Sequence, residues 1–402
     1  MTEKKETQKI LCVLYEDPST GYPPKYIRDE IPTLEKYPDN QTLPNPQSID
    51  FKPGDLLGSV SGELGLRKFL EEQGHKLIVT SDKDGPDSVF EKELEDADVV
   101  ISQPFWPAYL TEERLAKAKK LKMAITAGIG SDHVDLDAAM RRDLTVCEVT
   151  FCNSISVAEH TVMMILSVVR DYMTQYQHVL SGDWNIADCV QRSYDLEGMK
   201  VGIIGSGRIG LAVLKRLKPF DVDLHYTDRH RLSEEQEHDL GLHYHDTLES
   251  LLETCDVLSI HCPLHSETEY LFDTKLLQKM KKGSYLINTA RGKICDPYAI
   301  KEALESGQLA AYAGDVWFPQ PASANHPWRS MPHHAMTPHT SGTSLSAQAR
   351  YAAGVREILE NYFTGQAIRD EYLIVKDGCL AGCGAHSYSE GNSTAGIESV
   401  LQ

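Results

Sequence analysis

A glycine pattern near the middle of the chain constrains the fold more than any other feature. The run VGIIGSGRIG starts at Val201 and places Gly205, Gly207 and Gly210 in the spacing G-x-G-x-x-G. In such a turn the first glycine allows a tight bend, the second lets backbone approach a pyrophosphate, and the third lets a helix pack closely on a strand. The run lies between a predicted buried strand and a predicted helix over 211–217, whose N-terminus favours phosphate. We therefore predict a dinucleotide-binding unit in preference to a plain glycine-rich turn.

The residue that ends the next predicted strand indicates which dinucleotide binds. Asp228 stands eighteen residues after Gly210, close to the offset at which an acidic side chain accepts hydrogen bonds from the ribose 2′-hydroxyl. A carboxylate there repels a 2′-phosphate, so we predict NAD as the cofactor. Arg229 beside it would attract such a phosphate, which leaves some NADP activity open. The turn after Tyr15, at the equivalent place in the first half of the chain, has no glycine cluster and predicts no second cofactor site.

Short aliphatic strands alternate with helical spacing on both sides of this unit. Such an order predicts parallel sheets covered by helices on both faces. The fold class we expect is α/β, with two doubly wound Rossmann-like domains, the NAD-binding one (154–340) inserted into a catalytic, substrate-binding one (1–153 and 341–402). The predicted strands are Ile10–Tyr15, Lys76–Thr80, Val99–Ser102, Lys122–Thr126, Thr145–Val149, a strand from Lys200, Asp223–Thr227, Val257–His261, Ser284–Asn288 and Ala311–Asp315.

Four other segments carry expectations. Residues 16–53 hold eight of the nineteen prolines, which predicts an irregular arm. A helix is expected around 61–73, ending at Gly74, and a last helix over 343–363 stops at Gly365 and returns to the first domain. The stretch Val157–Tyr172 is apolar on nearly all sides. It fits either a core helix or a subunit interface, and we favour the interface.

Composition narrows the classes of partner. The 402 residues carry a formal net charge of −19, which disfavours nucleic acid and anionic membranes as partners. A small anionic substrate then requires a local cation. No signal-peptide core or membrane-length apolar run is present, and nine cysteines show no paired spacing. We interpret them as reduced thiols in a cytoplasmic protein, and we expect no metal site.

Two residues near the ends of second-domain strands are candidates for chemistry. Arg291 follows the strand that ends at Asn288, and the carboxyl ends of strands are where open α/β sheets bind ligands. Its planar guanidinium matches a carboxylate, although a surface ion pair is the ordinary role of a single arginine. His339 stands in a loop that leads back to the first domain. Between them lies the segment GDVWFPQP, which contains Gln320.

This arrangement resembles the D-2-hydroxyacid dehydrogenase superfamily and, within it, the bacterial NAD-dependent formate dehydrogenases. The resemblance covers nearly the whole chain and includes QPFWP from Gln103, TAGIGSDH from Thr126, Cys152–Ser154, Arg291, Gln320, His339 and Ser341–Gly342. In the superfamily an arginine binds the substrate carboxylate, and a glutamate 29 residues later pairs with a histidine that acts as acid and base. Gln320 occupies that glutamate position here, as in formate dehydrogenases.

The resemblance implies an activity and its residues. It implies oxidation of formate to CO₂ by direct hydride transfer to NAD⁺ without metal, in a homodimer. It implies that the catalytic residues are Arg291, His339, Gln320, Asn153, the backbone N–H of Ile129, and a small apolar wall of Pro104 and Phe105. The cofactor residues implied, together with the motif, are Gly205, Gly207, Arg208, Ile209, Gly210, Asp228, Arg229, Pro263, His265, Thr289, Asp315, His339, Ser341 and Gly342.

The chemistry supports formate on separate grounds. A 2-hydroxy acid loses an alcohol proton as well as a hydride, so its oxidation needs a general base. Formate has no such proton and needs a positioned anion in a suitable field, for which a neutral Gln320 beside His339 is adequate. The alternatives are a dehydrogenase that reduces glyoxylate or hydroxypyruvate, and a non-enzymatic NAD-sensing protein on the same fold. Cys152 and Cys262 adjoin these segments and are either oxidisable thiols or inert buried ones.

Overall fold

The computed structural model describes residues 6–16, 31–32, 42–52, 56 and 63–381. The chain divides into two compact units. Unit 1 comprises the described residues up to Asn153 together with those from Gly342 onward, and unit 2 comprises Ser154–Ser341. Most of the predicted proline-rich arm, and the end of the chain from residue 382, lie outside the described residues. In the described part of the chain, no helix combines the length and the apolar character needed to cross a lipid bilayer.

Unit 1 contains a seven-stranded sheet in the order β14-β13-β5-β4-β3-β1-β2. The five strands β1 to β5 pair in parallel, and β13 pairs antiparallel with both β5 and β14. The strands are β1 (Lys9–Val13), β2 (Lys76–Thr80), β3 (Val99–Ser102), β4 (Met123–Thr126), β5 (Thr145–Glu148), β13 (Leu373–Lys376) and β14 (Cys379–Leu380). The two short antiparallel strands were not predicted, because their sequences are too brief to show a period.

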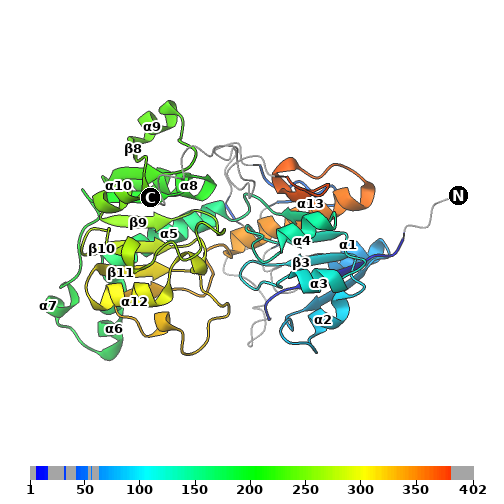
Figure 1. Cartoon of the computed structure of the whole chain (residues 1–402), viewed down its shortest axis with the longest axis horizontal. Coiled ribbons are helices and arrows are strands. Elements are labelled where there is room, and N and C mark those ends of the chain that lie inside the picture. The colour runs from blue at the N-terminus through cyan, green and yellow to red at the C-terminus, as the bar shows by residue number, and fades with distance from the viewer. Residues whose placement is uncertain (1–5, 17–30, 33–41, 53–55, 57–62, 382–402) are drawn as a thin grey trace. The chain divides into compact units, whose positions relative to one another are not determined.

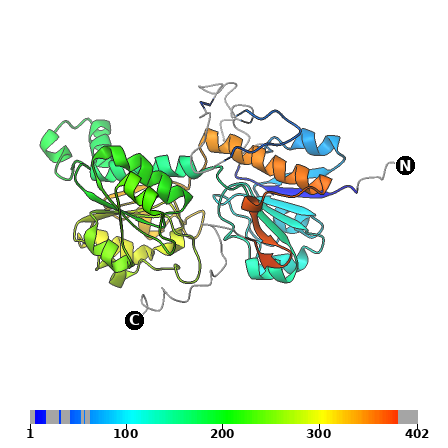
Figure 2. The ribbon, with the colours of Figure 1, turned by 90° about the horizontal axis from the view of Figure 1, so that it is seen from above.

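Helices cover both faces of this sheet because successive residues of each strand point to opposite sides. Ile10 and Cys12 pack in the core that contains α13, and Leu11 and Val13 pack in the other core with α2, α3 and α4. Figure 2 shows α13, in orange, along one face of the sheet. The helices are α1 (Arg67–Glu72), α2 (Val89–Leu94), α3 (Glu112–Lys117), α4 (Leu136–Arg141), α13 (Leu345–Thr364) and the 3₁₀ turn η4 (Asp370–Tyr372).

Two helix predictions in unit 1 are tested by this structure. The last helix, α13, ends at Gly365 in the left-handed conformation, as predicted, and belongs to unit 1. The Ser344 side chain caps its start by accepting from the Ala347 N–H. The first predicted helix is shorter than expected, since α1 covers only Arg67–Glu72. Residues 61–62, at its predicted start, lie outside the described part.

Unit 2 contains a second seven-stranded sheet, ordered β12-β11-β10-β9-β6-β7-β8, in which every pairing is parallel. The strands are β6 (Lys200–Ile204), β7 (Asp223–Thr227), β8 (Leu242–Tyr244), β9 (Val257–Ile260), β10 (Ser284–Asn288), β11 (Leu309–Gly314) and β12 (His334–Met336). The helices are α5 (Ser154–Val169), α6 (Tyr172–Ser181), α7 (Ile186–Cys189), α8 (Arg208–Leu217), α9 (Glu234–Leu240), α10 (Leu248–Thr254), α11 (Thr274–Leu277) and α12 (Pro297–Glu305), with 3₁₀ turns η1 (Lys218–Phe220), η2 (Gly292–Ile294) and η3 (Pro327–Arg329).

The two faces of this sheet carry different helices. Residues of α5 and α8 form one core with Val201, Ile203 and other strand residues, and residues of α10, α11 and α12 form the other core. Figure 1 labels α5, α8, α10 and α12 around the strands of this sheet. Two helix-covered, mainly parallel sheets confirm the predicted fold class of two Rossmann-like domains. The assignment of one domain to substrate and the other to NAD stays a prediction at this point.

The apolar stretch predicted as one helix over 157–172 is broken. Helix α5 ends at Val169, Asp171 adopts a left-handed conformation with φ of 49°, and α6 begins at Tyr172. Much of α5 is buried within unit 2, which supports the core interpretation for that helix. Met163 on α5 is exposed, but most of the exposed large apolar side chains of this region lie further along, on α6, α7 and the residues after them. In Figures 1 and 2, α6 and α7 project from the body of unit 2.

Candidate active site

The glycine turn is built as its spacing predicts. Gly205 follows β6 with φ of +91°, and a Cβ atom there would lie 2.9 Å from the backbone nitrogen of Cys262, just beyond β9. Gly207 is the N-cap of α8. A Cβ on Gly210 would lie 2.1 Å from the carbonyl oxygen of Gly205. Side chains at Gly205 and Gly210 would therefore collide with neighbouring backbone, so this tight turn requires glycine at both positions, as in turns that bind a pyrophosphate at a helix start.

Asp228 has a second role that the sequence reasoning missed. Its Oδ2 accepts from the Ser206 N–H at 2.6 Å and from the Ser206 hydroxyl at 3.2 Å, and its Oδ1 accepts from the His230 N–H at 2.8 Å. The carboxylate therefore ties the end of β7 to the glycine turn. A carboxylate offers about four acceptor positions, so capacity for a ribose hydroxyl remains.

The basic residues after Asp228 differ in their surroundings. Arg229 is exposed. The guanidinium of Arg231 donates to both carboxylate oxygens of Glu237, at 2.8 Å each, and lies 4.9 Å above the Tyr244 ring. Arg231 is thus occupied by an acidic partner, and Arg229 is the one placed beside Asp228 as the sequence suggested.

Asp315 organises the loop that carries His339. It is fully buried at the end of β11, and its carboxylate accepts from the N–H groups of Thr340 at 2.8 Å and Ser341 at 2.7 Å and from the Thr337 hydroxyl. His160 on α5 lies 3.1 Å from the same hydroxyl through Nε2. Burial lowers the pKa of His160, against the opposing charge of Asp315. Sequence reasoning missed His160, whose position within an apolar helix gave no signal.

The histidine and glutamine predicted to pair are in contact. Nδ1 of His339 lies 2.8 Å from Oε1 of Gln320. Because an amide oxygen only accepts, this contact places the proton on Nδ1. His339 has φ of +60°, which is uncommon for a residue with a side chain. Thr337 and Ser341 on either side are held by Asp315, which fixes this backbone.

Arg291 lies three residues beyond β10, in a turn supported by the last residue of that strand. The Asn288 amide nitrogen donates to the Arg291 carbonyl at 2.9 Å, and Oδ1 of Asn288 accepts from the Ala290 N–H at 3.0 Å. The Arg291 side chain is half-buried. Nearby, the hydroxyls of Thr289 and Thr161 lie 3.0 Å apart. The guanidinium is therefore presented from a braced turn at the carboxyl edge of the sheet.

The remaining predicted substrate residues belong to unit 1. Pro104 packs against Gly128, where a Cβ would lie 2.8 Å from the proline ring. Phe105 has its ring centroid 5.7 Å from that of Tyr15. Ile129 and Asn153 are buried, and Oδ1 of Asn153 has no hydrogen-bond partner among the described residues.

Glu148 supports the loop that carries Ile129, and the sequence gave no reason to single it out. Its buried Oε2 accepts from the Gly130 N–H at 2.9 Å and from the Ser131 hydroxyl at 3.3 Å. At the other end of unit 1, a Cβ on Gly342 would lie 2.5 Å from Nδ2 of Asn153. Gly342 and Asn153 are therefore neighbours within this unit.

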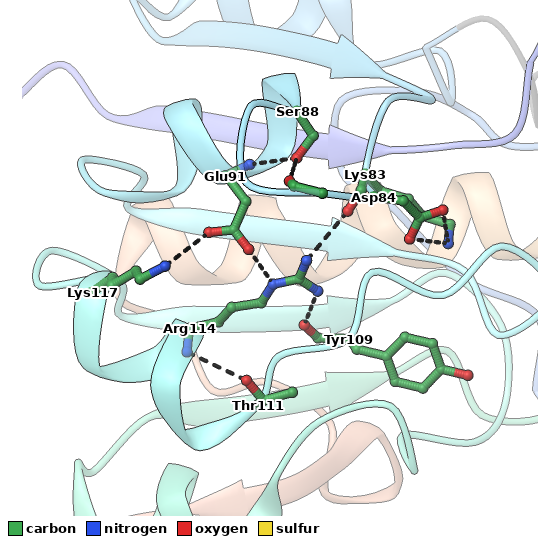
Figure 3. A network of polar contacts seen from close by, with 9 residues as sticks. Lys83, Asp84, Ser88, Glu91, Tyr109, Thr111, Arg114 and Lys117 are labelled. Atoms are coloured by element: carbon green, nitrogen blue, oxygen red, sulfur yellow. Dashed lines mark hydrogen bonds and ion pairs between the residues drawn. The ribbon is translucent and has the colours of Figure 1, made fainter.

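A clamp of charged side chains holds the segment that follows β3 (Figure 3). Arg114 donates to the carbonyls of Tyr109 at 2.8 Å and Lys83 at 3.3 Å, and to Glu91 at 2.6 Å. Burial disfavours the charged form of Glu91, but hydrogen bonds from Arg114 and Lys117 prevail and lower its pKa. We call Lys83, Glu91 and Arg114 the β3 clamp.

The β3 clamp reaches the predicted apolar wall through Trp106. The Lys83 ammonium lies 4.9 Å from the centre of the Trp106 ring, and the Trp106 indole donates to the Ser81 carbonyl at 3.2 Å. Trp106 directly follows Phe105 in the chain. The clamp therefore fixes the segment that carries Pro104 and Phe105.

The described cysteines are all free thiols, and Cys383 lies outside the described residues. Cys152 is buried, and burial raises its pKa well above the ordinary value. Burial likewise raises the pKa of Cys262 to about 12. Low thiolate content favours the inert interpretation for both. Among the described residues, no group of three or more His, Cys, Asp or Glu side chains is arranged to hold a metal ion.

Within unit 2, the predicted residues cluster at the carboxyl edge of one sheet. The glycine turn follows β6, Asp228 follows β7, Arg291 follows β10 and Asp315 follows β11. Pro263 and His265 follow β9, where Thr268 accepts from the His265 N–H at 3.0 Å. This is the edge at which open α/β sheets bind ligands.

Comparison with known proteins gives a consistent result. Residues 162–341 match the family model described as D-isomer specific 2-hydroxyacid dehydrogenase, NAD binding domain. A formate dehydrogenase of Pseudomonas sp. (strain 101) is 66% identical over 394 residues, which cover 98% of each chain. The mitochondrial formate dehydrogenase of Solanum tuberosum is 50% identical over 327 residues, covering 81% of this chain and 86% of the relative.

Solved structures agree with the sequence relatives. A formate dehydrogenase of Granulicella m. superposes with a TM-score of 0.90 at 68% identity, covering 93% of this chain and 100% of the other. An NAD-dependent formate dehydrogenase from Staphylococcus aureus, solved in complex with NAD, gives a TM-score of 0.76 at 41% identity over 92% and 99% of the two chains. These findings confirm the resemblance inferred from the motifs. The chain therefore belongs to the NAD-dependent formate dehydrogenases, within the family of D-isomer specific 2-hydroxyacid dehydrogenases.

Proposed function

We propose that this chain oxidises formate to CO₂ and passes the hydride directly to NAD⁺, without a metal ion. The observation that carries the proposal is the Gln320–His339 pair, whose Oε1 and Nδ1 atoms lie 2.8 Å apart. A 2-hydroxyacid dehydrogenase needs a base strong enough to take an alcohol proton, and a carboxylate beside the histidine would provide it. A neutral amide orients the same imidazole without placing a negative charge beside an anionic substrate.

Residues of this chain bind and orient formate in the proposed mechanism. Arg291 supplies the local cation that a net charge of −19 makes necessary, and its fork of N–H groups matches the two formate oxygens. The amide of Asn153 and the backbone N–H of Ile129 are further proposed donors to those oxygens. Pro104 and Phe105 form a small apolar wall that excludes water and larger acids.

The cofactor residues we propose belong to unit 2, except Gly342, which belongs to unit 1. NAD⁺ bound there would supply the hydride acceptor. Its pyrophosphate would lie against the glycine turn of Gly205, Gly207 and Gly210 with Arg208 and Ile209, and its adenosine ribose beside Asp228 and Arg229. Pro263 and His265 are proposed to line the same site. Thr289, Asp315, His339, Ser341 and Gly342 are proposed to hold the carboxamide end, where Asp315 keeps an acceptor position beyond the donors it already binds.

A comparison of two substrates tests the proposed reaction. Purified enzyme treated with a chelator is expected to form NADH from formate and NAD⁺, and to consume little NADH with glyoxylate or hydroxypyruvate, as followed by NADH absorbance. Activity with the 2-keto acids and none with formate would select the rival dehydrogenase. Absence of both, with NAD binding retained, would select the non-enzymatic sensor.

Gln320→Glu tests the mechanistic reason for preferring formate. A carboxylate next to the His339 imidazole would favour its protonated form and repel the substrate anion. Formate turnover should fall, and the pH range of kcat/KM should narrow. A Gln320→Glu enzyme that oxidises formate as well as the parent over the same pH range would contradict the role given to the neutral amide.

The assembly we propose is a homodimer formed through α6, α7 and the residues around them. Large apolar side chains are widely exposed there: Met163, Tyr172, Met173, Tyr176, Val179, Leu180, Trp184, Ile186, Val190 and Tyr194. A groove of about 1570 Å³ lies beside α6, lined among others by Met173, Gln177 and Tyr194. Large exposed apolar patches on soluble proteins often mark interaction sites. A second copy would cover them.

Light scattering tests the assembly. The parent is expected to have twice the mass of one chain, and Leu180→Asp, which places a charge on the exposed apolar face, should shift it toward the monomer. A parent that is monomeric at micromolar concentration would refute the proposed dimer. We also propose that the protein works in the cytoplasm, in keeping with its free cysteines.

A further inference from the structure

The three proposed catalytic side chains of unit 2 stand on three separate loops. Arg291 follows β10, Gln320 lies in the segment after β11, and His339 follows β12. Positioning of a bound substrate tolerates little error, since a displacement of about 1 Å costs on the order of 100-fold in rate. Some group must therefore hold these loops in register with one another.

Trp317 touches the loops on both sides of its own. Its indole Nε1–H donates to the carbonyl of Thr337 at 2.7 Å, two residues before His339. Its backbone is pressed against Gly292, the residue after Arg291. A Cβ atom on Gly292 would lie 2.4 Å from the carbonyl carbon of Trp317 and 2.7 Å from its oxygen. Trp317 thus contacts the loops that carry Arg291 and His339, and it stands three residues before Gln320 on the third loop.

A neutral histidine, His326, forms hydrogen bonds within the segment that carries Gln320, beside Trp317. Nε2 of His326 donates to the Phe318 carbonyl at 3.1 Å, while its Nδ1 accepts from the Trp328 N–H at 3.2 Å. One donating and one accepting nitrogen require the neutral ring, and burial lowers the pKa of His326 accordingly. The His326 ring meets the Trp317 ring edge-on, with centroids 5.3 Å apart.

We propose that Trp317 is a positioning residue that keeps Arg291, Gln320 and His339 in register. The inference rests on the proposed function and adds to it. The hydrogen bond from the indole N–H holds the His339 loop in position. The Trp317 backbone, in contact with Gly292, limits how closely the Arg291 turn can approach. Loss of the N–H should therefore affect turnover of bound formate more than the binding of NAD⁺.

A second tryptophan provides a matched control in the same aromatic cluster. The Trp328 ring centroid lies 5.9 Å from that of Trp317, and the side chain is 1% exposed. Its Nε1 is buried and has no hydrogen-bond partner among the described residues. Replacing either tryptophan by phenylalanine shortens a ring of the same cluster, but only Trp317→Phe removes a hydrogen bond to the His339 loop.

The test measures kcat, the KM values for formate and NAD⁺, and thermal unfolding for both variants. Trp317→Phe should lower kcat with formate by about 10- to 100-fold, with the KM for NAD⁺ close to that of the parent. Trp328→Phe should lower the unfolding temperature by about as much as Trp317→Phe does, but it should leave kcat within about twofold of the parent value. A merely structural role for Trp317 would not lower kcat alone in one variant while both variants lose similar stability and the KM for NAD⁺ stays constant.

Two outcomes would overturn the inference: parent-like kcat in Trp317→Phe, or an equal loss of kcat in both variants. If Trp317→Phe does not fold, Gly292→Ala replaces it, because the added methyl presses on the Trp317 backbone. A fall in kcat with NAD⁺ binding retained supports the inference, and parent-like kcat overturns it. A parent enzyme inactive with formate would instead refute the proposed function, so the two failures are distinguishable.

Discussion

In both units the first strand lies between two neighbouring strands in the same arrangement. The units differ in the residues that follow this first strand. In unit 1, β1 lies between β2 and β3, and in unit 2, β6 lies between β7 and β9. In unit 2 the residue after β6 is Gly205, which approaches the backbone beyond β9. In unit 1 the corresponding space is filled, because Tyr15 after β1 packs against Phe105 after β3 with ring centroids 5.7 Å apart.

The difference shows what topology determines and what it leaves to side chains. Parallel sheets of this kind have a crevice where the order reverses, and ligands bind there when the backbone is accessible. In unit 2 the turn after β6 carries glycines, which have no side chains to cover its backbone. In unit 1 the aromatic rings of Tyr15 and Phe105 lie at the corresponding place.

Closing the unit 2 crevice should have the largest effect. In Gly210→Ala the added methyl would lie 2.1 Å from the Gly205 carbonyl oxygen, so the turn must move away from α8. We expect the KM for NAD⁺ to rise by at least about 10-fold, from the loss of about 1.4 kcal/mol or more of binding energy. Steady-state kinetics with varied NAD⁺ measures it.

A glycine elsewhere in unit 2 is the control for that substitution. Gly307 has φ of +72°, and no atom lies within 4 Å of the position that an added methyl would take, so Gly307→Ala introduces only backbone strain. It should lower thermal stability and leave the KM for NAD⁺ unchanged. If Gly210→Ala behaves in the same way as Gly307→Ala, the glycine turn does not bind the cofactor.

Asp228→Ser sharpens the contrast at the ribose end of the same crevice. Serine keeps an oxygen that can accept from Ser206 but removes the charge that repels a 2′-phosphate. The ratio of kcat/KM for NADP⁺ to that for NAD⁺ should rise several-fold. Asp239→Ser, which removes an exposed carboxylate on α9, should leave the ratio unchanged. Lower stability of Asp228→Ser with an unaltered ratio would mean that Asp228 only supports the glycine turn.

The sequence predicted these features to different degrees, for physical reasons. The strands Lys76–Thr80, Val99–Ser102, Asp223–Thr227 and Ser284–Asn288 match their predicted bounds, because short segments rich in aliphatic and aromatic residues are the signal of buried strands. The glycine turn and the contact of Gln320 with His339 were also predictable, since motif spacing encodes them. The positions of the substrate and cofactor atoms themselves stay proposals.

Other features depend on contacts between segments distant in sequence. The contacts of His160 with Thr337 and of Glu148 with Gly130, and the β3 clamp, involve residues 18 to 177 positions apart, and single polar residues show no period. The break at Asp171 was missed because apolar residues continue across it into α6. The apolar residues after this break are exposed on α6 and α7, and they do not extend the buried helix α5.

Weakening the β3 clamp tests whether the filled crevice of unit 1 must be rigid. Arg114→Gln removes the ion pair with Glu91 and loosens the segment that carries Phe105. We expect the KM for formate to rise a few-fold and the KM for NAD⁺ to stay constant. Arg141→Gln, which breaks an exposed ion pair with Glu112 in the same unit, is the control. Equal kinetics in the two variants would show that the clamp contributes only to stability.

The smallest expected effect is a pH dependence of stability in unit 2, away from the crevice. Burial is the main cause that lowers the pKa of both His225 and His245, and their Nδ1 and Nε2 atoms lie 2.9 Å apart, so a charge on either ring disfavours a charge on the other. The charge of Lys200 also lowers the pKa of His225, whereas Asp223 raises it.

The sign of the pH dependence follows from these pKa values. A lowered pKa in the folded state means that the unfolded chain takes up protons first as the pH falls through about 6.5. Stability from this pair is therefore complete above that pH and is lost below it. The Tm should therefore fall when the pH is lowered from 8 to 5. His225→Gln should flatten the dependence of Tm on pH, whereas His238→Gln, at an exposed histidine on α9, should not. A parent Tm that rises on acidification, or an unchanged slope in His225→Gln, would show that the histidine pair does not control this dependence.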